Sequence, residues 1–235
     1  MNNNVFTHEI NKFAQLADHW WDPQGPLKSL HDINPLRLAF IQQHTLLHDA
    51  KILDVGCGAG ILTESLAKCS PKEIMGIDLA DSSLEVAKKH AQTMDLSINY
   101  QNQSIEELSL KQPAYFDIIT CMELLEHVPD PQAIVHHCAS LLTTGGKLFV
   151  STINQNIKAY LQAIIAAEYL LKIVPKHTHD YRYFITPAQL ARMARQAGLQ
   201  LTAMQGFSYK PLTQKYFSTP KVGVNYMAAY QKLSQ

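Results

Sequence analysis

The sequence has no excess of charge of either sign: among 235 residues, Lys and Arg together number 20, and so do Asp and Glu. Proteins that bind nucleic-acid phosphates usually carry a basic surplus, so we expect no nucleic-acid partner and infer a small-molecule one. The four cysteines form no C-x-x-C pair, which argues against a disulfide framework or a zinc knuckle and suits a reducing cytoplasm.

Long hydrophobic runs are also missing. The first 21 residues contain Glu9 and Asp18 and no apolar core of signal-peptide length, so we expect that the protein is not exported. Residues 157–174 are apolar, but polar side chains interrupt them too often for a transmembrane span: Lys158, Gln162, Glu168 and Lys172. We therefore expect one domain over residues 1–235, with a helical cap at 1–45 and a helical insert or lid at 153–180.

Short apolar runs separated by helix signals predict an α/β fold. The predicted strands are 51–55, 73–78, 97–101, 116–122 and 146–152, with two more near 199–208 and 222–230. The predicted helices are 60–68, 82–94, 131–142 and 187–197; Ser82 and Glu85 are spaced as a capping box, and Gly145–Gly146 is expected to end the third helix. This alternation predicts a mostly parallel sheet with helices on both faces.

A glycine-rich turn follows the first predicted strand. Gly56, Gly58 and Gly60 let the backbone approach a ligand, and Asp78, at the end of the second strand, can accept hydrogen bonds from ribose hydroxyls. A dinucleotide fingerprint needs glycine at position 61, where this sequence has Ile61, which disfavours a nicotinamide dehydrogenase.

The spacing G-x-G-x-G after Asp54 instead resembles motif I of the class I S-adenosylmethionine-dependent methyltransferases. That resemblance implies that Asp54 lies near the methionine amino group and that Asp78 holds the ribose. The guanidinium of Arg37 suits a bidentate clamp on the methionine carboxylate, although a surface salt bridge is the commoner role of arginine.

A closer resemblance covers residues 6 to 230. The strings "FAQLADHWWDPQGP", "INPLRL", "LDVGCGAG", "TCMELLEHVPDPQ" and "VNYM" are similar to the bacterial ubiquinone biosynthesis O-methyltransferase family. The resemblance implies a Rossmann-like sheet of seven strands with the last antiparallel, and methylation of ring hydroxyls on polyprenylated phenols and catechols. It places S-adenosylmethionine contacts on Arg37, Gly56, Asp78 and Met122. The acidic adenine contact common in the class is missing here, and we expect Ser104 and the backbone of Ile105 to take its place. Met122 is alternatively a core residue.

The segment "CMELLEHVPD" carries the predicted chemistry. A phenol has a pKa of about 10, so a base or a cation must help to deprotonate it. Glu123, Glu126 and His127 stand at i, i+3 and i+4 and would share one face of a helical turn. Two interpretations stay open: the three side chains hold Mg²⁺ or Mn²⁺, as the eukaryotic relatives imply, or His127 acts alone as general base.

The resemblance also concerns partners and location. A polyprenyl substrate dissolves in bilayers, so we expect a cytoplasmic protein with transient contact with the inner membrane surface or other ubiquinone-pathway enzymes. Residues 157–174 have the composition of an interfacial helix pair, and equally of a lid packed on its own core. The alternatives are methylation of another small phenol, or a catalytically silent subunit that binds cofactor or lipid.

Overall fold

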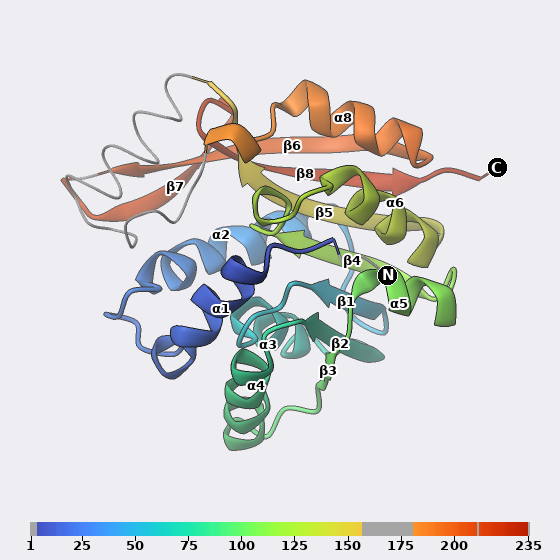
Figure 1. Ribbon diagram of the computed structural model, residues 1–235. Helices are drawn as coiled ribbons and strands as arrows, with labels where there is room; N and C mark the ends of the chain where they lie inside the picture. The colour runs from blue at the N-terminus through green and yellow to red at the C-terminus, as the bar shows by residue number, and fades with distance from the viewer. Residues whose placement is uncertain (1–3, 157–180, 211, 235) are drawn as a thin grey trace.

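The described residues form an eight-stranded sheet (Figure 1). The computed structural model describes residues 4–156, 181–210 and 212–234. The strand order is β3-β2-β1-β4-β5-β8-β6-β7; the first five run parallel, and β8 is antiparallel to both of its neighbours. In chain order the strands are β1 (Lys51–Val55), β2 (Glu73–Asp78), β3 (Asn99–Asn102), β4 (Phe116–Met122), β5 (Leu142–Ile153), β6 (Leu199–Lys210), β7 (Lys215–Thr219) and β8 (Asn225–Lys232).

The predicted α/β fold class is confirmed, but the predicted count of seven strands is wrong. The additional strand is β7, which pairs antiparallel with β6 at the edge of the sheet. Its five residues, "KYFST", contain only two large apolar side chains, so they carry too short an alternating pattern to predict a strand from sequence.

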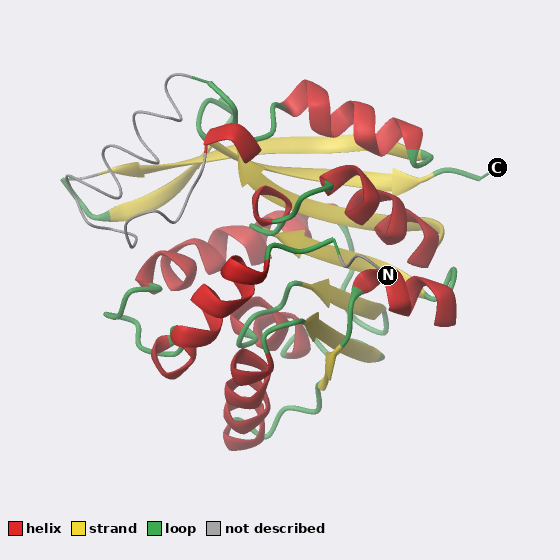
Figure 2. Cartoon of the chain, in the orientation of Figure 1, coloured by secondary structure: helices red, strands yellow, loops and turns green. Residues whose placement is uncertain are grey.

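Helices cover both faces of the sheet (Figure 2). Helices α5, α6 and α8 contribute to the hydrophobic cluster on one face, and α2 and α3 to the cluster on the other. In chain order the helices are α1 (Thr7–Gln15), α2 (Lys28–His44), α3 (Ile61–Ala67), α4 (Asp81–Thr93), α5 (Ile105–Lys111), α6 (Pro131–Leu141) and α8 (Pro187–Gln196). Single 3-10 turns form η1 (Ala17–His19), η2 (Leu125–His127) and η4 (Tyr181–Tyr183).

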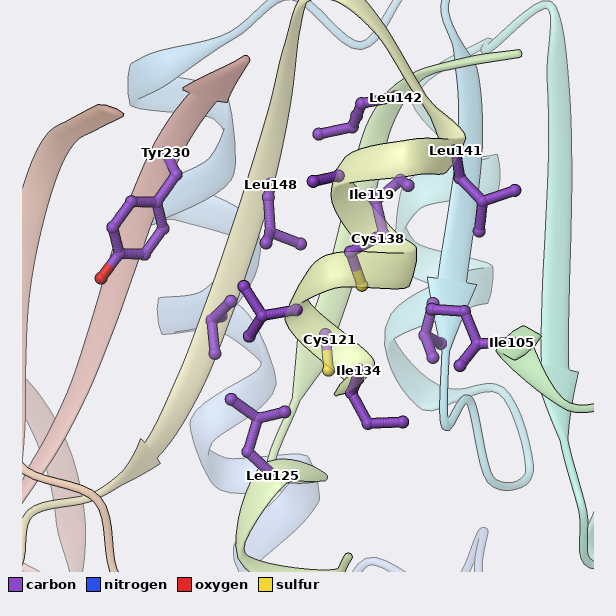
Figure 3. Packing of buried hydrophobic residues seen from close by; sticks show 14 of the residues in the cluster. Ile105, Ile119, Cys121, Leu125, Ile134, Cys138, Leu141, Leu142, Leu148 and Tyr230 are labelled. Carbon is purple, nitrogen blue, oxygen red and sulfur yellow. The ribbon is translucent and has the colours of Figure 1, made fainter. Parts of the chain in front are cut away.

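Strand β5 lies between the two clusters. Leu148 and Val150 belong to the cluster that includes α6, whereas Phe149 belongs to the cluster that includes α2, and all three are fully buried. Figure 3 shows Leu148 in the first cluster with Cys138 of α6 and Tyr230 of β8. A strand buried on both faces needs apolar residues at successive positions, which explains the continuous run "LFV".

Two predicted helix boundaries differ from the structure. Helix α6 begins as predicted, with Asp130 accepting a hydrogen bond from the Ala133 N–H at 3.1 Å, but it ends at Leu141. Gly145 and Gly146 therefore lie inside β5, where Gly145 has a φ of +80°. The chain extends at Leu142 because that side chain enters the core.

The predicted capping box of Ser82 and Glu85 is also wrong. Helix α4 begins at Asp81 after Ala80, which provides no side-chain cap, and Glu85 instead pairs with Lys88 at 2.9 Å. The capping box that does form belongs to α8, between Thr186 and Gln189. Both sites have the polar spacing of the motif, so spacing alone does not choose between them.

The N-terminal segment folds as α1, η1 and α2 and lies beside the carboxyl ends of the central strands (Figure 1). Most of the predicted insert, residues 157–180, lies outside the described residues. In the part of the chain that is described, each helix is either too short or too polar to cross a membrane.

Candidate active site

A cavity of about 290 Å³ lies where the parallel strands end. One end is lined by the turn after β1 and by Asp78, the last residue of β2, and the other by η2 and the strands β6 and β7. Residues of the N-terminal helices α1 and α2 also line the cavity. Crevices at the carboxyl ends of parallel strands are the usual ligand sites of such sheets.

The glycine turn between β1 and α3 is shaped by neighbouring side chains of the protein itself. Gly56, Gly58 and Gly60 all have positive φ angles, of +70°, +53° and +87°, which other residues rarely adopt. A Cβ at Gly58 would overlap the ring of Trp20, and one at Gly60 would overlap the hydroxyl of Tyr100. The turn therefore needs glycine for its own packing as well as for the approach of a ligand.

Two carboxylates hold this turn in place, that of the buried Asp54 and that of the half-buried Asp78. Asp78 accepts hydrogen bonds from the Gly58 N–H at 2.8 Å and the Ala80 N–H at 2.9 Å. Asp54 accepts hydrogen bonds from the hydroxyls of Thr63 at 2.6 Å and Thr120 at 2.7 Å. Burial raises the pKa of both carboxyls above the ordinary value for aspartate, and these hydrogen bonds oppose the rise. Both acids also line the cavity, as their predicted ligand roles require.

Arg37 of α2 extends into the cavity and is only 5% exposed. Its Nη2 lies 3.6 Å from Oε1 of Glu123, and its Nε and Nη2 make no hydrogen bond among the described residues. The indole nitrogen of Trp20 and the hydroxyl of Ser83, which belong to cavity-lining residues, likewise lack a described partner. Buried polar groups normally have partners, so these donors indicate that the cavity accepts a polar ligand with an anionic group.

Met122 and Ser104 also line the cavity. Met122 ends β4 and is 7% exposed. Ser104 is the N-cap of α5, and its Oγ accepts a hydrogen bond from the Glu107 N–H at 3.2 Å. The hydroxyl of Ser104 therefore already caps helix α5. The assignment of Ser104 to the cofactor from the sequence did not include this contact.

The structure does not place Glu123, Glu126 and His127 on one helical face as predicted. Glu123 has a left-handed backbone with a φ of +54°, and only Leu125–His127 form a 3-10 turn. The Glu123 N–H donates to the backbone oxygen of Ser151 at 3.1 Å, which ties the turn to β5. Glutamate rarely adopts this conformation, so a sequence pattern that assumes a regular helix assigns the wrong directions to these side chains.

Each of the three side chains has a different partner. Glu123 accepts a hydrogen bond from the Ser151 hydroxyl at 2.6 Å, and Glu126 accepts one from the Thr152 hydroxyl at 2.8 Å. His127 Nδ1 lies 2.8 Å from Oε2 of Glu9. Among the described residues, no three His, Cys, Asp or Glu side chains are grouped so that they could hold a metal ion. The predicted set of Glu123, Glu126 and His127 therefore does not fit Mg²⁺ in this arrangement.

The cavity contains residues that the sequence pattern did not identify. Glu9 and Phe13 of α1, Phe207 of β6 and Tyr216 of β7 all line it. Burial raises the pKa of Tyr216 above the ordinary value for a phenol, so its hydroxyl stays protonated at neutral pH. For the contacts of the N-terminal segment, the signal in the sequence was the pair Trp20–Trp21, whose large rings needed a surface to cover.

The sheet order, the glycine turn and the acid after β2 define the class: a Rossmann-like methyltransferase of the class I S-adenosylmethionine-dependent type. A family model described as a methyltransferase domain matches residues 32–204. The chain is 50% identical over 229 residues to a protein from Methylococcus capsulatus named ubiquinone biosynthesis O-methyltransferase, covering 97% of this chain and 96% of that one. A protein of the same name from Neisseria meningitidis serogroup C is 52% identical over 227 residues, covering 96% and 95%. The chain belongs to the ubiquinone biosynthesis O-methyltransferase family.

Solved structures support the fold. The magnesium protoporphyrin IX methyltransferase from Synechocystis, in its crystal structure with bound SAH, has a TM-score of 0.70 at 15% identity, covering 94% of each chain. A methyltransferase from Methanosarcina mazei has a TM-score of 0.65 at 19% identity, covering 83% of this chain and 98% of that one. At such low identity, these likenesses concern the arrangement of strands and helices.

The packing of Trp20 against Gly58 predicts the effect of a single methyl group. In Gly58→Ala, we expect the new Cβ to displace Trp20, because the backbone there is left-handed and the ring occupies that space. The emission of Trp20 and Trp21, the only two tryptophans of the sequence, would shift to longer wavelength. Binding of S-adenosylhomocysteine, measured by calorimetry, would weaken by about tenfold or more.

Gly198→Ala is the matched control for this prediction. Gly198 also has a positive φ, of +76°, but no described atom lies within 4 Å of an added Cβ. It should therefore show backbone strain without the change in emission or binding. Unchanged emission in Gly58→Ala would contradict the packing described above.

Proposed function

We propose that this protein transfers the methyl group of S-adenosylmethionine to ring hydroxyls of polyprenylated phenol and catechol intermediates of ubiquinone biosynthesis. The observation that carries the proposal is one continuous cavity that runs from the glycine turn to His127, in a chain about half identical to ubiquinone biosynthesis O-methyltransferases. We also propose that residues 1–235 act as one domain, since cap and sheet residues line the same cavity.

The cofactor end of the cavity has donors and acceptors that suit S-adenosylmethionine. Asp78 would accept hydrogen bonds from the ribose, and Gly56 and Gly58 let the chain approach the ligand closely. The Nε and Nη2 of Arg37, which make no hydrogen bond among the described residues, would bind the methionine carboxylate, for which a planar guanidinium is well shaped. When bound, the cofactor supplies an electrophilic methyl group for in-line displacement from sulfur.

The acceptor end of the cavity supplies the proton chemistry. A phenol hydroxyl with a pKa of about 10 must lose its proton as the new oxygen–carbon bond forms. The imidazole of His127 lines this end of the cavity and is the group there whose ordinary pKa lies closest to neutrality. Phe13 and Phe207 also line the cavity and give an aromatic ring apolar surface to pack against.

His127→Gln tests the role of the imidazole. We expect kcat with a catechol substrate to fall by about 10²- to 10⁴-fold, the usual contribution of a general base, with little change in the affinity for S-adenosylhomocysteine. His136→Gln is the matched control, because His136 is exposed on the neighbouring helix α6. Retention of wild-type kcat by His127→Gln would show that another group accepts the proton.

The engagement of Glu123 and Glu126 by hydroxyl groups predicts the response to a chelator. Because each carboxylate already accepts a hydrogen bond from β5, we expect dialysis against a strong chelator to leave turnover of a catechol unchanged. Loss of turnover that is restored by Mg²⁺ would mean that these side chains rearrange to bind the cation.

We further propose transient contact with the cytoplasmic surface of the inner membrane, because a polyprenyl tail partitions into the bilayer. The supporting feature is the apolar sequence of residues 157–174, with Lys158, Lys172 and Lys176 at or near its ends. Contact with other enzymes of the pathway is the alternative route by which such a substrate could arrive.

Liposome flotation tests the membrane proposal. We expect a variant with Ser in place of Ile164, Ile165 and Leu170 to float less than the wild type, because it buries less apolar area in the interface. The double variant Leu46→Ser, Leu110→Ser is the control, since these side chains are 86% and 80% exposed but lie away from the carboxyl ends of the strands. Equal recovery of all three proteins would contradict contact by this segment.

A further inference from the structure

Glu9 of α1 makes the closest described polar contact of His127. Its Oε2 lies 2.8 Å from His127 Nδ1, although the two residues are 118 positions apart in the chain. Both side chains are largely buried, at 15% and 11% exposure, and both line the cavity. The ring of Phe13 meets the imidazole edge to face, with centroids 5.4 Å apart.

The surroundings keep Glu9 ionised. Burial raises the pKa of the Glu9 carboxyl, but the hydrogen bond and charge of His127, with Lys12 at 3.6 Å and His8 at 3.4 Å, outweigh burial and hold that pKa below the ordinary value. A carboxylate accepts hydrogen bonds and donates none, so Nδ1 of His127 must donate to it. In the neutral imidazole, the lone pair is then on Nε2.

Helix α1 is anchored beyond this contact. Asn4 and Asp130 exchange two hydrogen bonds, of 2.6 and 2.7 Å, which fix the segment before α1 to the start of α6. At the other end of α1, the Ser82 hydroxyl donates to the Ala14 oxygen at 3.2 Å. Glu9 is therefore presented to His127 by a helix that is tied to the sheet domain at both ends.

Other ionisable groups surround the pair. Glu126 is on the same turn but is bonded to Thr152, and Glu123 is bonded to Ser151 and faces Arg37. The turn η4, which packs against η2, carries Arg182, Tyr181 and Tyr183. The remaining titratable residues of the cavity wall, among those described, are Lys12, Asp54, Cys57, Asp78, Glu106 and Tyr216.

We propose that Glu9 is a positioning residue of the active site, which fixes the orientation and tautomer of His127 and stabilises the imidazolium that forms when His127 takes the substrate proton. This rests on the proposed function, because it assumes that His127 is the base. The arrangement has the logic of a carboxylate–histidine pair, in which the acid orients the ring and is not itself protonated. A helix of the N-terminal segment thus contributes to the chemistry at the acceptor end.

Glu9→Gln tests the inference, because the amide keeps the size of the side chain and removes its charge. We expect kcat with a catechol substrate to fall on the order of tenfold or more, while the affinity for S-adenosylhomocysteine stays within about twofold of wild type. The acidic limb of the pH profile of kcat/KM would move to lower pH, since an imidazolium without its anionic neighbour releases its proton more readily. In Glu9→Asp, which keeps the charge, this limb would stay at the wild-type pH and kcat would fall less.

Glu85→Gln is the matched control. Glu85 also has a lysine at i+3, Lys88, but its side chain is 61% exposed on α4, so we expect a wild-type rate and pH profile. Tryptophan emission reports whether the N-terminal segment stays in place. If the Glu9→Gln variant loses the wild-type emission, the Glu9→Asp variant provides the test. The role of the charge would be overturned if Glu9→Asp kept the wild-type emission but had a kcat as low as that of His127→Gln. It would also be overturned if the acidic limb of the pH profile moved in Glu9→Asp.

The two hypotheses fail in distinguishable ways. If His127→Gln is inactive while Glu9→Gln matches Glu85→Gln in kcat and pH profile, Glu9 has no positioning role and the proposed function stands. If His127→Gln keeps full turnover, the proposed base is wrong, and with it the role of Glu9.

Discussion

Parallel pairing of the inner strands is the constraint on which the site depends. Asp54 of β1 lies in register with Gly76 of β2 on one side and Thr120 of β4 on the other, so all three strands end at the same edge of the sheet. The hydroxyls of Thr120 and Thr63 donate to Asp54 and so link β4 and α3 to β1, just before the glycine turn. The glycine turn, the acid after β2 and the turn η2 meet at one cavity for this reason.

The N-terminal segment contributes side chains to both ends of the cavity. Trp20 packs against Gly58 at the cofactor end of the cavity, while Glu9 contacts His127 at the acceptor end. Arg37, on α2, faces the space between these ends. One continuous stretch of chain therefore contacts both ends of the cavity.

The turn after β4 shows how backbone conformation decides chemistry. A regular helix would direct Glu123, Glu126 and His127 to one side, as a metal site requires. The left-handed Glu123 and the short 3-10 turn instead give these residues separate partners on β5 and α1. Hydroxyl groups of β5 donate hydrogen bonds to both carboxylates, whose oxygens are then less available to a cation. The imidazole pairs with a different carboxylate, that of Glu9.

The sequence by itself determined the fold class, seven of the eight strands and the family, because these depend on local apolar patterns and on strings that are specific even without a structure. The glycine turn and Asp78 were identifiable for the same reason: a single strand–turn–helix unit determines their spacing. Only the tertiary structure decided that Glu9 is the partner of His127, that Trp20 fills the space beside Gly58 and that Tyr216 reaches the cavity. Each of these contacts joins segments far apart in the chain, and no periodicity within a segment reports on the partner across the cavity.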